Sequence, residues 1–250
     1  MFESSARAVA ALCQDVHARG WVANHDGNVS VRLDDGRFLA SPTAVSKRDV
    51  RVETLVTLDG EGKVVAGSRR VFSEFSLHLA AFRTRSDARW VLHAHPPHAT
   101  AWACVGESFW EAPFLAEAVV SLGHEIPVVA YASPGSPTSG LERAIARCDA
   151  VLLGNHGVLV VAPDAETAYL RMELVEHLAR VAAIARPMGG TRPLPANDIA
   201  KLLEARQKAG LGPQGSRSSE ASASEWRVVD PTLLRPDVDS LVRDALKRLA

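Results

Sequence analysis

Three histidines in two apolar segments are the residues of this chain best suited to chemistry. His93 and His95 end the run Trp90-Val91-Leu92-His93-Ala94-His95, which is typical of a β-strand and is closed by Pro96-Pro97. Because side chains alternate along a strand, both imidazoles project from the same face, roughly 6.5–7 Å apart. Two rings placed in this way could share one cation at Zn–N distances of about 2.0–2.1 Å. The alternative is a polar strand end with two solvated histidines.

The third histidine, His156, lies in a glycine-flanked turn between two apolar runs, Ala150-Val151-Leu152-Leu153 and Val158-Leu159-Val160-Val161. A histidine in such a turn is a poor core residue, because its ring nitrogens would need polar partners. Together with His93 and His95 it completes the set of three protein ligands of a catalytic zinc-type site, which leaves a coordination position for substrate. We therefore predict that these three histidines bind a divalent metal ion.

Composition and charge limit the class of protein. The 250 residues are 47% hydrophobic and 23% charged, which fits one large globular domain or one domain with an appendage. A formal net charge of -1 gives no indication of the excess positive charge with which proteins bind nucleic acid. The three cysteines lie far apart, which favours reduced thiols over a disulfide framework. The chain starts without a secretory leader and has no apolar run of about 18 residues, so we expect a cytoplasmic protein that does not cross a membrane.

Hydrophobic periodicity predicts strands early in the chain and helices interleaved later, an order that favours a mixed sheet covered by helices. Asp34-Asp35-Gly36 and Gly60-Glu61-Gly62 predict hairpins, while Ser73 and Asp164 are expected to cap helices. Residues 126–131 are predicted to form a strand. The predicted helices span residues 4–19, 73–83, 98–104, 113–122, 139–147, 164–186 and 198–209.

The composition changes after Pro187. We therefore divide the chain into a catalytic domain, residues 1–187, and a C-terminal helical extension, residues 188–250. Gly, Ser and charged residues dominate 210–224, which predicts a linker or flexible segment. Residues 238–249 are predicted to form a last amphipathic helix that packs on the body or on a neighbouring subunit.

Five short motifs follow one another in a fixed order. They are Gly27-Asn28-Val29-Ser30, Pro42-Thr43-Ala44, Ser73-Glu74-Phe75, His93-Ala94-His95-Pro96 and Asn155-His156-Gly157. In this order and with these gaps the series resembles the class II aldolase/adducin family. The resemblance covers about residues 6–187. It implies an α/β fold with α+β character, in which helices cover both faces of a mixed, mainly antiparallel sheet.

By this resemblance His93, His95 and His156 would be zinc ligands, with manganese or cobalt as alternative metals. Glu74 would be the catalytic carboxylate, which can also touch the metal. A carboxylate beside such a site can move a proton if a partly buried setting raises its pKa. Without the resemblance, Glu74 would be read as a first-turn carboxylate favoured by the helix dipole.

The same resemblance places a phosphate pocket at Asn28, Thr43, Ala44 and Ser73, where amides and hydroxyls suit an anion. Taken alone, Asn28 could be an ordinary turn residue.

Three positions depart from the family pattern. Phe72 replaces one of two serines, which removes a hydroxyl donor, and Ala44 replaces a glycine. The family's proton-donating tyrosine, which comes from a neighbouring subunit, falls near residues 114–116, where no side chain can carry a proton. Glu117 is the nearest titratable substitute, although it could equally be a solvated helix carboxylate.

The resemblance implies a metal-dependent aldehyde-lyase of carbohydrate metabolism, similar to the L-fuculose-phosphate aldolases. Such an enzyme cleaves a phosphorylated ketose into dihydroxyacetone phosphate and an aldehyde through a zinc-stabilised enediolate. The same intermediate would serve a sugar-phosphate epimerase or a keto-acid decarboxylase. A non-catalytic adducin-like interaction module is the alternative from another class, and the presence of three histidines with Glu74 argues against it. The resemblance also implies a homotetramer with sites at subunit interfaces.

Overall fold

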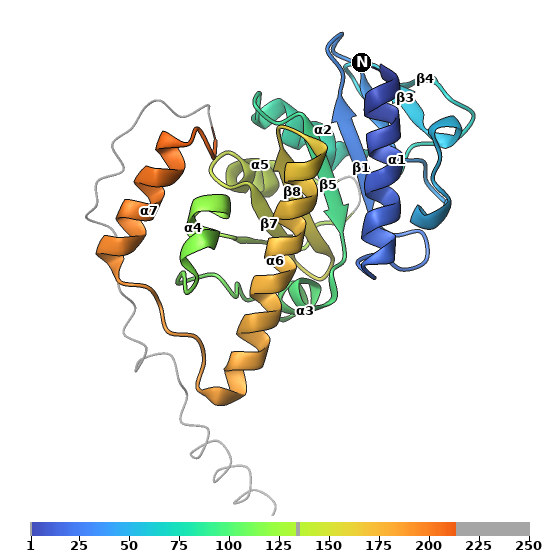
Figure 1. Cartoon of the computed structure of the whole chain (residues 1–250). Coiled ribbons are helices and arrows are strands. Elements are labelled where there is room, and N and C mark those ends of the chain that lie inside the picture. Colours follow the sequence, from blue (N-terminus) through green and yellow to red (C-terminus); the bar gives the residue numbers. More distant parts are fainter. Residues whose placement is uncertain (1, 134–135, 214–250) are drawn as a thin grey trace, which may run out of the picture. The chain divides into compact units, whose positions relative to one another are not determined.

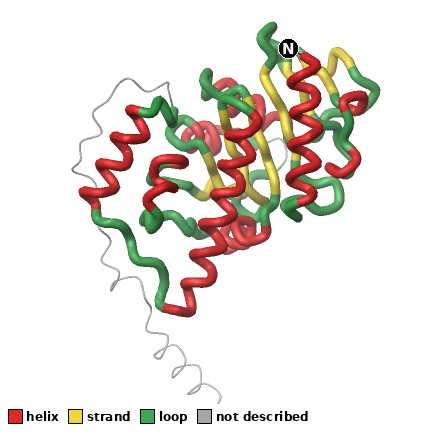
Figure 2. The backbone as a smooth tube through the Cα atoms, viewed as in Figure 1, coloured by secondary structure: helices red, strands yellow, loops and turns green. Residues whose placement is uncertain are grey.

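An eight-stranded sheet organises the described part of the chain, with the strand order β4-β3-β2-β1-β5-β8-β7-β6 (Figures 1 and 2). The computed structural model describes residues 2–133 and 136–213. Neighbouring strands are antiparallel, except that β6 and β7 run parallel. The strands are β1 (Asn28–Arg32), β2 (Phe38–Ala40), β3 (Val56–Leu58), β4 (Val64–Ala66), β5 (Trp90–Ala94), β6 (Val128–Val129), β7 (Ala150–Leu153) and β8 (Gly157–Ala162).

Helices cover both faces of this sheet, as the predicted fold class requires (Figure 1). One face packs against α1, α3 and α6, and the other against α2 and α5. None of the described helices is long and apolar enough to cross a membrane. The helices are α1 (Phe2–Ala18), α2 (Phe75–Thr84), α3 (Pro97–Val105), α4 (Ala116–Leu122), α5 (Ser139–Ile145), α6 (Ala165–Ala185) and α7 (Ala196–Lys208), with short 3-10 turns η1 (Lys47–Asp49), η2 (Val52–Thr54) and η3 (Arg186–Met188).

Alternation along β5 fills both cores. Val91 packs in the cluster under α2 and α5, whereas Leu92 and Ala94 pack in the cluster under α1, α3 and α6. Residues two apart share a face of a strand, so His93 points to the same side as Val91. The fold therefore directs His93 toward the face that carries α2.

The predicted cap at Asp164 is confirmed, and the predicted cap at Ser73 is wrong. The Asp164 carboxylate accepts a hydrogen bond from the backbone N–H of Thr167, and α6 begins directly after it. In contrast, α2 begins at Phe75 with Glu74 in the N-cap position. Phe72 and Phe75 are both buried, so the chain must turn through Ser73 and Glu74 before the helix can start. Ser73 is consequently exposed and free for other contacts.

Two other predicted elements are shorter than expected. The strand predicted for 126–131 is reduced to the two residues of β6. The helix predicted for 113–122 begins only at Ala116, because the carbonyl of Pro113 accepts a hydrogen bond from Leu194 instead of starting a helical turn. The hydrogen bond from Leu194 thus overrides the helical pattern at residues 113–115.

The helix α7, which lies after the predicted boundary at residue 187, packs beside α4. The Arg206 guanidinium donates to the backbone carbonyl of Val120 at 2.7 Å and pairs with Asp149. The division at residue 187 stays a prediction. The predicted helix 238–249 and most of the predicted flexible segment, residues 214–224, lie outside the described residues.

Candidate active site

The candidate site forms where β1 begins, β5 ends and the β7–β8 turn reverses the chain. Asn28 on β1 lies opposite His93 on β5 in the antiparallel register, so the two side chains point to the same face. His95 follows β5 directly, and His156 lies in the β7–β8 turn. The last residue before α2, Glu74, faces this group. Four separate parts of the chain thus contribute to one site.

The structure brings the three histidines into one cluster. One ring nitrogen from each of His93, His95 and His156 lies within 4.8 Å of the others. The Nε2 atoms of His93 and His95 are 3.0 Å apart. The ring centroids of His93 and His156 are separated by 4.6 Å. Rings this close can share one divalent cation with small side-chain shifts.

Two glycines permit this approach. A side chain at Gly157 would place its Cβ 2.5 Å from the His95 ring and 2.6 Å from the carbonyl oxygen of Ala94. At Gly27, where φ is +71°, a Cβ would meet Val22 at 2.5 Å and the carbonyl oxygen of His93 at 3.0 Å. Only glycine fits such contacts, so both motif glycines hold backbone close to the metal-binding candidates.

The donor set fits a divalent metal. The Nδ1–H of His93 donates to the carbonyl oxygen of Val158 at 2.8 Å, which leaves the lone pair of Nε2 facing the cluster. Burial lowers the pKa of His93 to about 3, so the ring is neutral at physiological pH, as a ligand must be. Burial also lowers the pKa of His95. Three imidazoles beside a carboxylate form a donor set typical of zinc and similar metals.

Glu74 is the carboxylate beside the cluster. Its Oε1 accepts a hydrogen bond from Nε2 of His156 at 2.8 Å, and its Oε2 accepts one from Nδ2 of Asn28 at 2.9 Å. Oε2 also lies 3.7 Å from Nε2 of His93. Burial alone would raise the pKa of Glu74, but the hydrogen bond from His156 and the electrostatic effect of the neighbouring histidines lower that pKa overall. In this arrangement Glu74 is ionised, and we expect its proton affinity to depend on whether the histidines bind a metal.

A cavity of about 240 Å³ opens beside Glu74. Three of the predicted phosphate-binding residues, Asn28, Thr43 and Ser73, line it, and Phe72 contributes an apolar wall. The fourth, Ala44, is not among its lining residues and is exposed, with a left-handed φ of 56°. That conformation is the one in which glycine costs least, in agreement with the family's glycine at this position.

Sequence reasoning missed two charged residues near the histidines. Lys47 lines the same cavity although it is almost fully buried. Asp26 lies 3.7 Å from Nδ1 of His95. Asp26 directly precedes the Gly27-Asn28 motif and Lys47 closely follows the Pro42-Thr43 motif, and this proximity in the sequence could have identified both residues. Glu117 is exposed on α4 and does not line the cavity, so its predicted role would need a neighbouring subunit.

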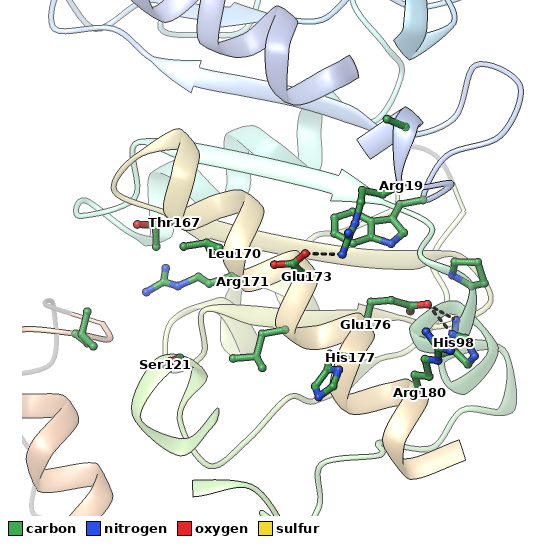
Figure 3. Close-up of a pocket in the computed structure, with 15 residues that line it drawn as sticks. Arg19, His98, Ser121, Thr167, Leu170, Arg171, Glu173, Glu176, His177 and Arg180 are labelled. Atoms are coloured by element: carbon green, nitrogen blue, oxygen red, sulfur yellow. Dashed lines mark hydrogen bonds and ion pairs between the residues drawn. The ribbon is translucent and has the colours of Figure 1, made fainter. Parts of the chain in front are cut away.

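A larger cavity of about 1020 Å³ lies along α6 (Figure 3). The charged side chains that line it are largely paired with each other: Arg19 binds Glu173, and His98 contacts Glu176 at 2.7 Å. None of His93, His95 and His156 lines it. Because Glu74 and two of the three candidate metal ligands, His95 and His156, line the smaller cavity, that cavity is the better candidate for an active site.

The sheet and the helices that cover it define a mixed α/β protein, and the histidine cluster is its candidate metal site. Within that class, residues 7–183 match the family described as the Class II Aldolase and Adducin N-terminal domain. The chain therefore belongs to the class II aldolase/adducin family, as the motif series predicted.

Two relatives and one solved structure are similar to this chain over most of their length. A 3-oxo-tetronate 4-phosphate decarboxylase of Pectobacterium atrosepticum is 33% identical over 74% of this chain and 85% of its own. An L-fuculose phosphate aldolase of Escherichia coli is 30% identical over 82% of this chain and 95% of its own. The crystal structure of YgbL from Escherichia coli matches with a TM-score of 0.73 and 28% identity, covering 81% of this chain and 99% of that one.

Proposed function

We propose that this protein is a divalent-metal-dependent lyase that cleaves a phosphorylated ketose by a retro-aldol reaction. The products would be dihydroxyacetone phosphate and an aldehyde. The observation that carries this proposal is the position of Glu74, whose carboxylate contacts His156 and lies 3.7 Å from His93, two members of one histidine cluster. A carboxylate in hydrogen-bonding reach of a metal-binding cluster is suited to proton transfer at a carbon next to a carbonyl.

His93, His95 and His156 would hold the metal, with zinc the first choice and manganese or cobalt as alternatives. A divalent cation held there would supply a Lewis acid for the substrate carbonyl. When the C–C bond breaks, its electron pair is delocalised into that carbonyl. Glu74 first takes up a proton from solvent and then delivers it to the adjacent carbon, while Asn28 holds the second carboxylate oxygen and fixes the orientation of the group.

The phosphate would bind in the adjoining part of the cavity. The hydroxyls of Thr43 and Ser73 line this cavity and are suited to donate to phosphate oxygens. Asn28 also lines it, and its buried Oδ1 has no hydrogen-bond partner among the described residues. A substrate hydroxyl would satisfy that acceptor, since buried polar atoms are rarely left unpaired.

Decarboxylation of a phosphorylated 3-oxo acid is a second candidate. The 33% identity to a 3-oxo-tetronate 4-phosphate decarboxylase favours it. So does the lack of a titratable side chain in Phe114-Leu115-Ala116, because loss of CO₂ needs no second proton carrier for a leaving aldehyde. The proton delivered by Glu74 would be the same in both reactions.

A retro-aldol reaction needs a group that accepts the hydroxyl proton of the leaving aldehyde, and we propose Glu117 of a neighbouring subunit for this role. The proposal requires an oligomer, and we expect a homotetramer. Sedimentation velocity gives the oligomeric state. Glu117→Gln should then lower turnover of a ketose 1-phosphate without changing the assembly. Normal turnover in this variant would remove Glu117 from the mechanism.

The experiment that tests the proposed function is a substrate panel with two product assays. Zinc-loaded protein is incubated with ketose 1-phosphates while dihydroxyacetone phosphate is measured, and with 3-oxo-tetronate 4-phosphate while CO₂ is measured. Chelated protein is the control, and manganese and cobalt replace zinc in parallel. Formation of dihydroxyacetone phosphate supports the aldolase, and release of CO₂ alone supports the decarboxylase. If neither product forms with any of the three metals, the lyase proposal is wrong.

A further inference from the structure

Lys47 is a buried cation that lies beside the candidate active site. It is only 1% exposed, in the η1 turn that follows the Pro42-Thr43-Ala44 motif. Its Nζ donates to the backbone carbonyl oxygens of His25 at 2.9 Å and Val45 at 3.3 Å. An ammonium has three N–H donors, and no third acceptor contacts this one in the described part of the chain.

The other buried cations of the described chain are all neutralised. Arg85, Arg171 and Arg206 each form an ion pair with the carboxylate of Asp149. Lys47 forms no ion pair with any described carboxylate within 4.0 Å. Asp26 and Glu74 attract the Lys47 ammonium across the cavity but do not contact it. A buried ammonium without a contacting counter-ion is costly, so a purely structural role explains Lys47 poorly.

The surroundings of Lys47 suggest what would neutralise it. Lys47 lines the cavity of about 240 Å³ beside Glu74, and it is the only lysine or arginine among the described residues that line this cavity. Asp26 and Glu74 make the same cavity negative, whereas Thr43 and Ser73 offer only neutral hydroxyls. A divalent metal held by the histidines would offset Glu74, and Lys47 is the positive charge that the lining residues themselves offer to an anionic substrate.

We propose that Lys47 determines the specificity of this cavity by binding an oxyanion of the substrate, either a phosphate monoester or a carboxylate. The site would then accept anionic sugar derivatives and reject neutral sugars of the same shape. The inference rests on the proposed function for the identity of the substrate, but the binding of an anion can be measured without turnover.

The test compares anion affinity in three full-length proteins: the wild type, Lys47→Met and Lys47→Gln. Inorganic phosphate and glycolate are titrated separately by calorimetry at equal metal content. Methionine keeps the apolar stem without the charge, and glutamine keeps a donor for the carbonyl of His25. Lys63→Met is the matched control, because Lys63 is an exposed lysine in the β3–β4 turn. Thermal unfolding establishes which variants are folded. One folded variant, either Lys47→Met or Lys47→Gln, is sufficient for the test.

A charge-assisted hydrogen bond contributes about 1.5–3 kcal/mol, so loss of the ammonium should weaken binding about 10- to 100-fold. Weakening for phosphate identifies a phosphate monoester, and weakening for glycolate identifies a carboxylate. Lys63→Met should bind both anions as the wild type does. The proposal is overturned if the wild type binds neither anion, or if a folded Lys47 variant binds both with wild-type affinity.

Kinetics separate this inference from the proposed function. If the wild type cleaves a substrate of the panel, Lys47→Met should raise KM at least tenfold and change kcat by less than about threefold, since uniform binding is lost. An unchanged KM would overturn the role of Lys47 and leave the lyase intact. Lys47-dependent anion binding without turnover of any substrate would overturn the lyase and leave the role of Lys47 intact.

Discussion

Asp149 and Glu74 each lie within 4 Å of nitrogen atoms from three side chains that are distant in the sequence, but only Glu74 faces a cavity. Asp149 is fully buried, and its oxygens contact Arg85 and Arg171 at 2.8 Å and pair with Arg206. Arginine is always charged and has no lone pair to offer. This cluster is therefore closed: it joins β7, α6, α7 and the segment after α2, and it cannot take up a ligand.

Glu74 meets histidines instead, and its side chain remains 28% exposed toward a cavity. A histidine can be neutral and present a lone pair, and burial lowers the pKa of His93 and His95 toward that state. This cluster remains open to a metal and a substrate. A buried carboxylate paired with arginines therefore stabilises the fold. A partly exposed carboxylate beside histidines is suited to chemistry, because histidine can offer a lone pair and the cavity admits solvent.

The largest expected effect is on activity when a member of the open cluster is removed. His95→Ala takes away one of three candidate ligands, so we expect activity to fall to background and bound zinc to drop below one per chain. The free energy of unfolding of the metal-free protein should change by less than about 2 kcal/mol, because His95 is only partly buried. Metal analysis and a turnover assay check this. Near-normal turnover would exclude His95 from the site.

Glu74→Gln tests the carboxylate of the same cluster. It keeps the shape and removes the proton-carrying group, so we expect turnover to fall roughly 10²- to 10⁴-fold while metal content remains near that of the wild type. Metal loss in parallel with activity would instead make Glu74 a ligand whose main role is to hold the ion. Wild-type turnover would contradict both roles.

Asp149→Asn tests the closed cluster. It leaves the buried guanidinium groups of Arg171 and Arg206 without a counter-charge, while Arg85 keeps its pair with Asp87, so we expect the free energy of unfolding to fall by about 3–5 kcal/mol. Urea denaturation at neutral pH measures this change. Asp35→Asn is the control, because Asp35 pairs with Arg37 at the surface and should contribute no more than about 1 kcal/mol. Equal losses in both variants would contradict the distinction between buried and exposed pairs.

The smallest expected effect is a pH dependence of the free energy of unfolding that arises from His78. The arginines around Asp149 cannot produce it, because arginine is always charged. His78 on α2 is fully buried, its Nδ1 contacts the Ser30 hydroxyl at 2.7 Å, and burial lowers its pKa to about 3. Between an unfolded pKa near 6.5 and this folded value, only the unfolded chain binds the proton. Stability is therefore present above about pH 6.5 and lost as the pH falls, by up to about 1.4 kcal/mol per pH unit.

Comparison with His78→Asn isolates this contribution. The slope of the unfolding free energy between pH 6.5 and pH 4 should be smaller in the variant by up to one proton equivalent. Chemical denaturation at a series of pH values measures both slopes. Identical slopes would show that His78 is already protonated in the folded state.

Local sequence determined the elements and the ligand candidates of this protein. The apolar run Trp90-Val91-Leu92 indicated a strand, and β5 pairs with β1 and β8 on its two sides. Gly-flanked His156 indicated a tight turn, and the β7–β8 turn is held by a close approach at Gly157. These features depend on the spacing of residue types along the chain, which can be read from the sequence alone.

Tertiary structure alone decided which side chains meet. The order of β1, β5 and β8 in the sheet brings Asn28, Glu74 and the histidines together, and no local pattern specifies that order. The same holds for Lys47, which was not singled out in the sequence, and for Asp149, whose three arginine partners are separated along the chain. Long-range pairing also shortened β6 and delayed the start of α2, since hydrogen bonds and burial formed between distant segments outweigh local propensity.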